Sequence, residues 1–297
     1  MSDLKRAHNF NPGPGVDYHI SYGGNDISLS KFDSSGVFLW AKTWGGISSD
    51  QGYGAAVDGS GNIYTTGSFQ STVDFDPGPD VDDHTAMVAD VFLSKFDSSG
   101  AFLWAKTWGG TSVSLPNNVD ADAAGNVFVT GYFYGTDDFD PGPGEDSHTA
   151  NGFSQDVFLS KLDSSGGFLW AKTWGGSSSD YGYNVAVDVA GNVFVTGYFS
   201  GTVDFNPDSG VDSHVSNGGY YADAYLSKFD SSGAFLWAKT WGGDSTDSGI
   251  GVDTDTAGNT YVAGYFSTTT DFDPGTDVDN HTSNGGSDVF LSKFPPE

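Results

Sequence analysis

The sequence predicts an all-β fold built from one repeated unit, and three observations support this. The run Lys-Phe-Asp-Ser-Ser-Gly recurs every 64 to 67 residues, short segments rich in β-branched and aromatic residues alternate with turns, and no amphipathic helical stretch is present. The copies begin at Lys31, Lys95, Lys161 (with Leu in place of Phe) and Lys228, and a shortened copy begins at Lys293. A unit repeated along 297 residues indicates a single array rather than several unrelated domains.

Each unit is expected to contain four strands. In the third copy, residues 183–188 and 193–199 are predicted to form one hairpin, and residues 224–229 and 235–241 a second hairpin around the Asp-Ser-Ser-Gly turn. A loop of roughly twenty residues that begins at Asp204 joins the two hairpins. Four strands per unit with short turns are typical of a β-propeller blade.

The blade boundaries follow from the repeat. Complete blades are expected at residues 45–108, 109–174 and 175–241, between incomplete blades at 1–44 and 242–297, so that residues 1–297 form one array. The first incomplete blade lacks inner strands and the last lacks an outer strand, so the two are complementary. We therefore expect a β-propeller of four or five blades, each of about 65 residues, closed within the chain or by a neighbouring subunit. Closure between chains would give a head-to-tail oligomer or a filament.

Composition excludes several classes of protein. The net charge of −28, from 39 acids and 11 bases, leaves no basic surface for nucleic acid or for anionic membranes. Cysteine is absent, which excludes disulfides and thiolate chemistry. No apolar run is long enough for a membrane helix, so we expect no membrane insertion, and no apolar signal segment opens the sequence.

The long loops carry oxygen-bearing side chains at a fixed spacing. The first and third positions of an Asp-Phe-Asp-Pro-Gly run, with Asn in two copies, are followed by Asp eight residues after the first position. Alternate oxygen ligands followed by glycine are how a loop surrounds Ca²⁺, so these residues are the predicted calcium ligands. The alternative is a turn whose carboxylates cap backbone amides. The predicted ligands are Asn9, Asn11, Asp17, Asp74, Asp76, Asp82, Asp138, Asp140, Asp146, Asp204, Asn206, Asp212, Asp271, Asp273 and Asp279.

Other polar residues also recur. Because calcium prefers oxygen, we expect each repeated histidine to pack on its loop and to hydrogen-bond a carboxylate or a carbonyl, with a transition-metal site and a catalytic base as alternatives. An aspartate precedes every third strand, and a Ser-Asp-x-Gly pattern at residues 49–52 and 179–182 is lost at Leu115-Pro116. The histidines are His19, His84, His148, His214 and His281, and the aspartates are Asp26, Asp90, Asp156, Asp223 and Asp288.

All eight tryptophans lie in the predicted outer strands, two per strand and four residues apart. This spacing places both rings on one face of the strand. We expect the rings to pack between blades, and the alternative is that they form platforms for sugars. The tryptophans are Trp40, Trp44, Trp104, Trp108, Trp170, Trp174, Trp237 and Trp241.

Three runs of the unit resemble the SBBP-type β-propeller repeat of bacterial proteins. They are Gly-Asn-Val-Phe-Val-Thr-Gly-Tyr-Phe at 191–199, Asp-Val-Phe-Leu-Ser-Lys-Phe-Asp-Ser-Ser-Gly at 90–100 and Leu-Trp-Ala-Lys-Thr-Trp-Gly-Gly at 103–110. The resemblance implies propeller blades and occurrence in large secreted or surface proteins. It implies no settled activity and no catalytic residues.

These observations favour a calcium-binding, non-enzymatic protein that is extracellular or at the cell surface and acts in adhesion, structure or self-assembly. Loops of modest affinity would fill with Ca²⁺ in millimolar surroundings. The alternative is a multivalent lectin with one glycan site per blade, which requires exposed aromatic rings beside the loops. An enzyme is not expected, because the carboxylates recur equivalently and catalysis needs groups whose surroundings differ.

Overall fold

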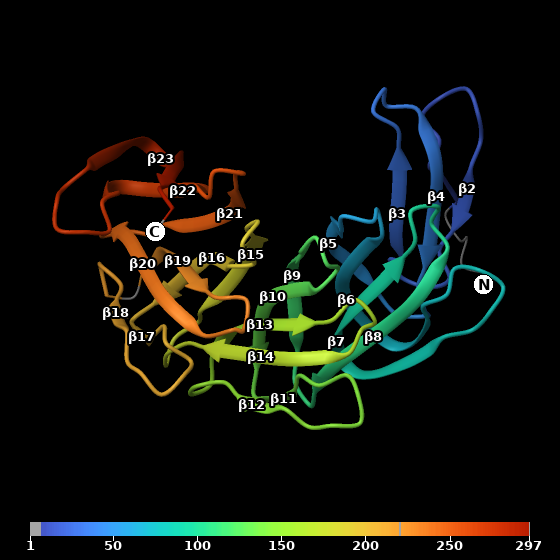
Figure 1. Cartoon of the computed structure of the whole chain (residues 1–297), viewed down its shortest axis with the longest axis horizontal. Helices are drawn as coiled ribbons and strands as arrows, with labels where there is room; N and C mark the ends of the chain where they lie inside the picture. Colours follow the sequence, from blue (N-terminus) through green and yellow to red (C-terminus); the bar gives the residue numbers. More distant parts are fainter. Residues whose placement is uncertain (1–6, 220, 297) are drawn as a thin grey trace.

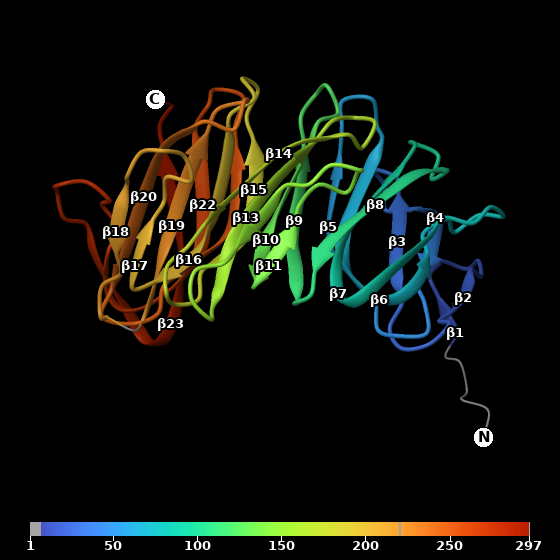
Figure 2. The same ribbon diagram turned by 90° about the horizontal axis from the view of Figure 1, so that it is seen from below.

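The computed structural model describes residues 7–219 and 221–296, which form strands β1 to β23 and no helix. The repeated units follow one another along an arc, with the N-terminal strands at one end and the C-terminal strands at the other (Figure 1). The sheets stand side by side along the long axis of the molecule (Figure 2). Among the described residues no helix is long and apolar enough to cross a membrane.

Three complete units each form an antiparallel four-stranded sheet, with the strand order that the sequence predicts. From the inner to the outer strand, the sheets are β5 (Gln51–Val57), β6 (Ile63–Asp74), β7 (Asp83–Phe96) and β8 (Phe102–Gly110); β9 (Ser114–Ala121), β10 (Val127–Tyr134), β13 (Gln155–Leu162) and β14 (Phe168–Trp174); and β15 (Tyr181–Val187), β16 (Val193–Ser200), β19 (Ala222–Phe229) and β20 (Phe235–Gly243). Each outer strand ends beside the loop strand of the following unit, as in the bridge between Gly176 and Val203.

The first and fifth units contain fewer strands. The first has β3 (Ile27–Phe32) paired with β4 (Phe38–Trp44), and the fifth has β21 (Ser248–Thr254), β22 (Thr260–Asp271) and β23 (Asn280–Phe294). In the described part of the chain, β3 pairs with β4 and β23 pairs with β22, and no strand pairing joins the two units. Closure within one chain, one of the two forms that the sequence predicts, is not present in this structure (Figure 1).

The sequence predicts a long loop in each unit, but in the structure most of these loops contain short strands. Their two arms pair as short antiparallel hairpins, and β-branched threonine and valine, which favour strands, recur in these arms. In the second and fifth units the hairpin continues β6 into β7 and β22 into β23. In the other units it is separate, with strands β1 (Ala7–Asn9) and β2 (Tyr18–Ile20), β11 (Thr136–Asp138) and β12 (Ser147–Thr149), and β17 (Thr202–Asp204) and β18 (Ser213–Val215).

The core lies between the units, because each of the three complete sheets has a neighbouring sheet on both faces. Val91 and Leu93 of β7 pack with Val119 and Val127 of the next unit, and all four are nearly inaccessible. Burial of such aliphatic side chains contributes about 1.5–3 kcal/mol each.

The second tryptophan of each outer strand fills the same space. Trp44, Trp108, Trp174 and Trp241 are 3–4% exposed. Trp44 meets Phe92 of the next unit edge-to-face at 6.5 Å, and Trp174 meets Tyr225 in the same way at 6.4 Å. Packing between units, the prediction made for these rings, is confirmed, because an indole buried to this extent cannot serve as a sugar platform.

Lysines and glycines of the repeat also bridge neighbouring units. The third-strand lysine of one unit donates to a carbonyl in the Asp-Ser-Ser-Gly turn of the next unit: Lys31 to Ser98 at 2.6 Å, Lys95 to Ser164 at 2.7 Å and Lys161 to Ser231 at 2.7 Å. These third-strand lysines therefore bind the neighbouring unit.

The turn glycine lies on the first tryptophan of the preceding unit. Gly100 has a φ of 85°, and a Cβ on it would lie 2.8 Å from the Trp40 ring.

Candidate functional site

The loop hairpins bring the predicted calcium ligands together at their tips. In the second unit, Oδ1 of Asp74 accepts hydrogen bonds from the amides of Asp76 at 3.1 Å and Asp82 at 2.9 Å. Oδ1 of Asp76 accepts one from the amide of Gly78 at 2.6 Å. The first side chain thus joins the two arms of the hairpin, and the second shapes its tip.

The same arrangement recurs in the other four loops. The first side chain of each accepts from two amides at 2.8–3.1 Å, and the next one caps the amide two residues on. These sets are Asn9, Asn11 and Asp17; Asp138, Asp140 and Asp146; Asp204, Asn206 and Asp212; and Asp271, Asp273 and Asp279.

These contacts are the turn-capping geometry that the sequence analysis held as its alternative. One oxygen of each first side chain is already used by two amides. Across residues 7–219 and 221–296, no three His, Asp or Glu side chains gather in a way that could hold a metal ion. Calcium binding by the loops therefore stays a prediction.

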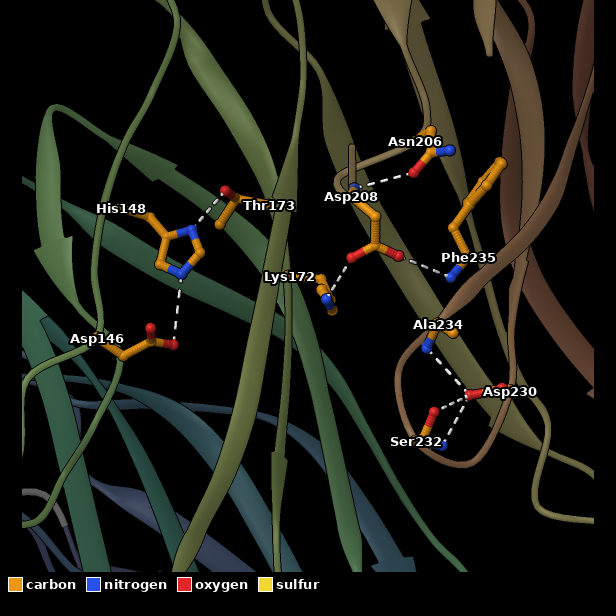
Figure 3. Close-up of polar contacts among 10 residues, drawn as sticks. All are labelled: Asp146, His148, Lys172, Thr173, Asn206, Asp208, Asp230, Ser232, Ala234 and Phe235. Carbon is orange, nitrogen blue, oxygen red and sulfur yellow. Dashed lines mark hydrogen bonds and ion pairs between the residues drawn. The ribbon is translucent and has the colours of Figure 1, made fainter. Parts of the chain in front are cut away.

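Four of the five repeated histidines fasten their loop to the outer strand of their own unit, and His281 of the fifth unit contacts Asp279. Nδ1 of His148 lies 2.9 Å from Oγ1 of Thr173, and Nε2 lies 3.3 Å from the Asp146 carboxylate (Figure 3). The ring also packs edge-on against Phe139 at 5.5 Å. His19, His84 and His214 make the equivalent threonine and carboxylate contacts. Hydrogen bonding to a loop carboxylate, the prediction made for these histidines, is thus confirmed for His148 and His281, and the other three lie 3.3–3.5 Å from theirs.

The aromatic residue of the loops is buried in the complete units. Phe75, Phe139 and Phe205 are all 0% exposed and contact aromatic rings of their own sheet. A lectin needs an exposed ring face beside the loop, and these three rings offer none.

One loop is also tied to the preceding unit. Asp208 stands where the other four loops have glycine, and its Oδ1 lies 2.6 Å from Nζ of Lys172 on β14 (Figure 3). Its Oδ2 accepts from the amide of Phe235 at 3.2 Å. The turn beside it is held by Asp230, which accepts from the amides of Ser232 and Ala234 (Figure 3). These carboxylates all act as caps or ties.

A second set of acids lies in the junctions between units; the sequence shows that these aspartates recur but does not predict that they pair. Asp156 precedes β13 and Asp180 precedes β15 of the next unit; they are 2% and 0% exposed. The amide of Asp180 donates to the carbonyl of Gln155 at 2.8 Å, which places the two aspartates next to each other. Two carboxylates are therefore buried together in this junction.

Their hydrogen bonds are unequal. Asp180 accepts from the amides of Gly176 at 2.7 Å and Ser200 at 3.0 Å, one on each oxygen. Asp156 accepts from Asn151 through Oδ2 only, and its Oδ1 is buried without a hydrogen bond. Burial raises the pKa of Asp156 to about 6, and burial together with the charge of Asp156 raises the pKa of Asp180 to about 7.

The fourth and fifth units repeat this arrangement. Asp223 and Asp247 are 1% and 0% exposed, and the amide of Asp247 donates to the carbonyl of Ala222 at 2.7 Å. Oδ1 of Asp223 is again buried without a hydrogen bond. Burial and the charge of Asp247 raise the pKa of Asp223 to about 7.

The junction between the second and third units reaches the same result with different residues. Here Ser114 occupies the place of Asp180, but Asp137 occupies the place where the fourth unit has Val203. Ser114 donates a hydrogen bond to Asp137, which is 0% exposed. Burial, together with the charge of Asp137, raises the pKa of Asp90 to about 6. The signal in the sequence was the loss of Ser-Asp-x-Gly at Leu115-Pro116, which coincides with an added aspartate in the loop.

Comparison with known proteins supports the repeat assignment. A family model described as a β-propeller repeat, SBBP, matches residues 169–199, which confirms the resemblance over one outer strand and the following hairpin. An uncharacterized WD repeat-containing protein of Acanthamoeba polyphaga mimivirus is 27% identical over 211 residues, or 66% of this chain. The chain spans 15% of the length of that relative. The protein is thus an all-β chain with similarity to propeller repeats.

Proposed function

We propose that this chain is a non-enzymatic scaffold of β-propeller blades that acts by association, outside the cell or at the cell surface, in adhesion or assembly. The observation that carries the proposal is the exposure of β23. Val289 is 86% and Leu291 72% exposed, whereas their counterparts Val91 and Leu93 in β7 are 0% exposed.

An uncovered strand of this kind favours binding to another protein surface. The described residues leave the outer edge of β23 without a strand partner, and such an edge can pair with another chain. Its apolar face adjoins a hollow lined by Phe272, His281 and Leu291. Exposed apolar surface next to a free edge is typical of an interaction site.

A second copy of the chain is the partner that we propose. In this chain the sheets that cover strands like β23 are units of the same repeat, so a copy carries complementary surfaces. The other end of the array exposes Phe32 at 44%, beside the unpaired edge of β3, whereas its counterparts Phe96 and Phe229 are 0% exposed. Three complete blades and two incomplete ones would then be closed by a neighbouring subunit, in a ring or a filament.

Calcium in the loops is part of the same proposal. The loop acids lie at exposed hairpin tips in five equivalent positions, and one oxygen of each first-position carboxylate makes no loop contact. Extracellular calcium is concentrated enough to fill sites of modest affinity. Calcium would also reduce the repulsion between copies that each carry a net charge of −28.

Light scattering after size exclusion tests the association. The wild-type chain should form oligomers that grow with protein concentration and with salt, because salt screens the repulsion. Val289→Lys with Leu291→Lys should give a monomer. Val211→Lys with Val278→Lys is the matched control, because these side chains are 79% and 69% exposed on loops. A wild-type chain that stays monomeric at all concentrations would contradict the proposal.

A further inference from the structure

The junction acids present an electrostatic problem that the described contacts leave unsolved. Asp156 and Asp180 are buried side by side, and no basic side chain of the described residues forms an ion pair with either of them. Removing a carboxylate from water costs several kcal/mol unless an opposite charge compensates. Two adjacent carboxylates are therefore costly to keep charged unless a cation or a proton lies between them.

At each of these junctions one carboxylate oxygen is buried without a hydrogen-bond partner. Oδ1 of Asp156, of Asp223 and of Asp90 is buried and accepts no hydrogen bond, although the other contacts of Asp156 and Asp223 are well formed. Nearly all buried polar atoms in proteins have a partner, so these repeated exceptions, which the buried Nε1 atoms of Trp108, Trp174 and Trp241 share, require an explanation. A ligand bound at this position would provide the missing partner.

At the junction between the second and third units, Ser114 replaces one aspartate and Asp137 is added. This replacement indicates that the second carboxylate does more than cap amides. If the acid served only to cap amides, its replacement by Ser114 would need no compensation. Instead Asp137, on a different strand, carries a carboxylate into the same junction, and its Oδ1 is also buried without a hydrogen bond. The charge has been moved to another strand and kept.

We propose that each of these junctions binds one hard cation, best Ca²⁺, between its two carboxylates. The pairs are Asp90 with Asp137, Asp156 with Asp180, and Asp223 with Asp247. All the side-chain donors are oxygen atoms, which is the ligand type that Ca²⁺ prefers, and backbone carbonyls and water supply the remaining positions. This site is separate from the loop tips and does not depend on calcium binding there.

Glycine keeps the space that the carboxylate occupies. A Cβ on Gly175 would lie 2.4 Å from Oδ1 of Asp156, and a Cβ on Gly242 would lie 2.3 Å from Oδ1 of Asp223. Both glycines follow the buried tryptophan of the outer strand. A bound cation would therefore join the third strand and outer strand of one unit to the first residues of the next.

Calcium stoichiometry of the full chain tests the proposal. Asp156→Asn with Asp180→Asn should bind one calcium fewer per chain than the wild type in titration calorimetry at pH 7.5. Excitation of the adjacent tryptophan should sensitise bound Tb³⁺, and this emission should fall in the variant. Asp223→Asn with Asp247→Asn should behave in the same way, and it replaces the first variant if that one fails to fold.

Two controls separate this site from the others. Asp80→Asn with Asp244→Asn removes the same charge from exposed positions and should leave the stoichiometry unchanged. Asp138→Asn with Asp140→Asn disables one loop tip, so its effect reports the loop proposal alone. Unchanged stoichiometry in both junction variants would overturn the proposal, as would a wild-type chain that binds no calcium and is stabilised at low pH only, since a shared proton would then neutralise each pair.

Discussion

Strands β7 and β23 contain the same seven residues, Asp-Val-Phe-Leu-Ser-Lys-Phe, at 90–96 and 288–294, yet they lie in different surroundings. Val91 and Leu93 are fully buried, whereas Val289 and Leu291 are largely exposed. The opposite faces are alike, because Phe96 and Phe294 are both buried against the preceding unit. The comparison teaches that the heptapeptide specifies the strand and its two faces, and that a neighbouring unit decides whether the second face is covered.

The largest effect expected from this comparison is a difference between two equivalent leucines. Leu93→Ala should lower the free energy of unfolding by about 2–5 kcal/mol, because it opens a cavity between two units. Leu291→Ala should change it by less than about 0.5 kcal/mol in dilute solution. Urea unfolding of both variants measures this. Equal losses would break the comparison and mean that β23 is covered in solution.

The junction acids sharpen the comparison, because their burial also depends on the neighbouring unit. Burial raises the pKa of Asp156 to about 6 and, with the charge of Asp156, that of Asp180 to about 7, from a usual value of 3.8. A folded-state pKa above the unfolded value gives stability that is complete below the unfolded value and is lost as pH rises through the folded one.

The midpoint temperature of thermal unfolding in EGTA should therefore decrease as the pH is raised from 5 to 8. Asp180→Asn should flatten this dependence, and millimolar calcium should oppose it in the wild type. A midpoint that rises with pH over this range would show that these carboxylates are stabilised in their charged form without metal.

The smallest effect concerns the lysines of the same heptapeptide. Lys95 donates to the carbonyl of Ser164 at 2.7 Å, whereas Lys293 lies over the ring of Tyr261 at 5.4 Å. A hydrogen bond to a charged group contributes about 1.5–3 kcal/mol, so Lys95→Met should destabilise by an amount in that range at most, partly offset by the apolar packing of methionine. Lys293→Met is the matched variant and should be nearly neutral. A comparable loss in both would indicate that the bridge to Ser164 contributes little.

Much of the fold was predictable because local patterns determine it. Alternation and turn residues located the strands, the unit period located the sheets, and the four-residue spacing of Trp40 and Trp44 placed both rings on the face that packs against the next unit. The closure of the array was not predictable, since it depends on which surfaces meet and not on any local pattern.

The candidate sites were less accessible to sequence reasoning. An aspartate that caps amides and an aspartate that binds calcium require the same alternate spacing, so Asp74 and Asp76 fit both. The junction pairs were missed because Asp156 and Asp180 belong to different units and meet only when the sheets pack. At the second junction even the position changes, as Ser114 and Asp137 together replace one aspartate.

The lysine bridges described above all run in one direction along the chain. The first, second and third units each give an ammonium group to the following unit, so each of these three contacts has a donor side and an acceptor side. Two copies related by a two-fold axis would place lysine against lysine and carbonyl against carbonyl. Copies that join through these surfaces must therefore all face the same way, and the assembly has a polarity that the bridges of a single chain already define.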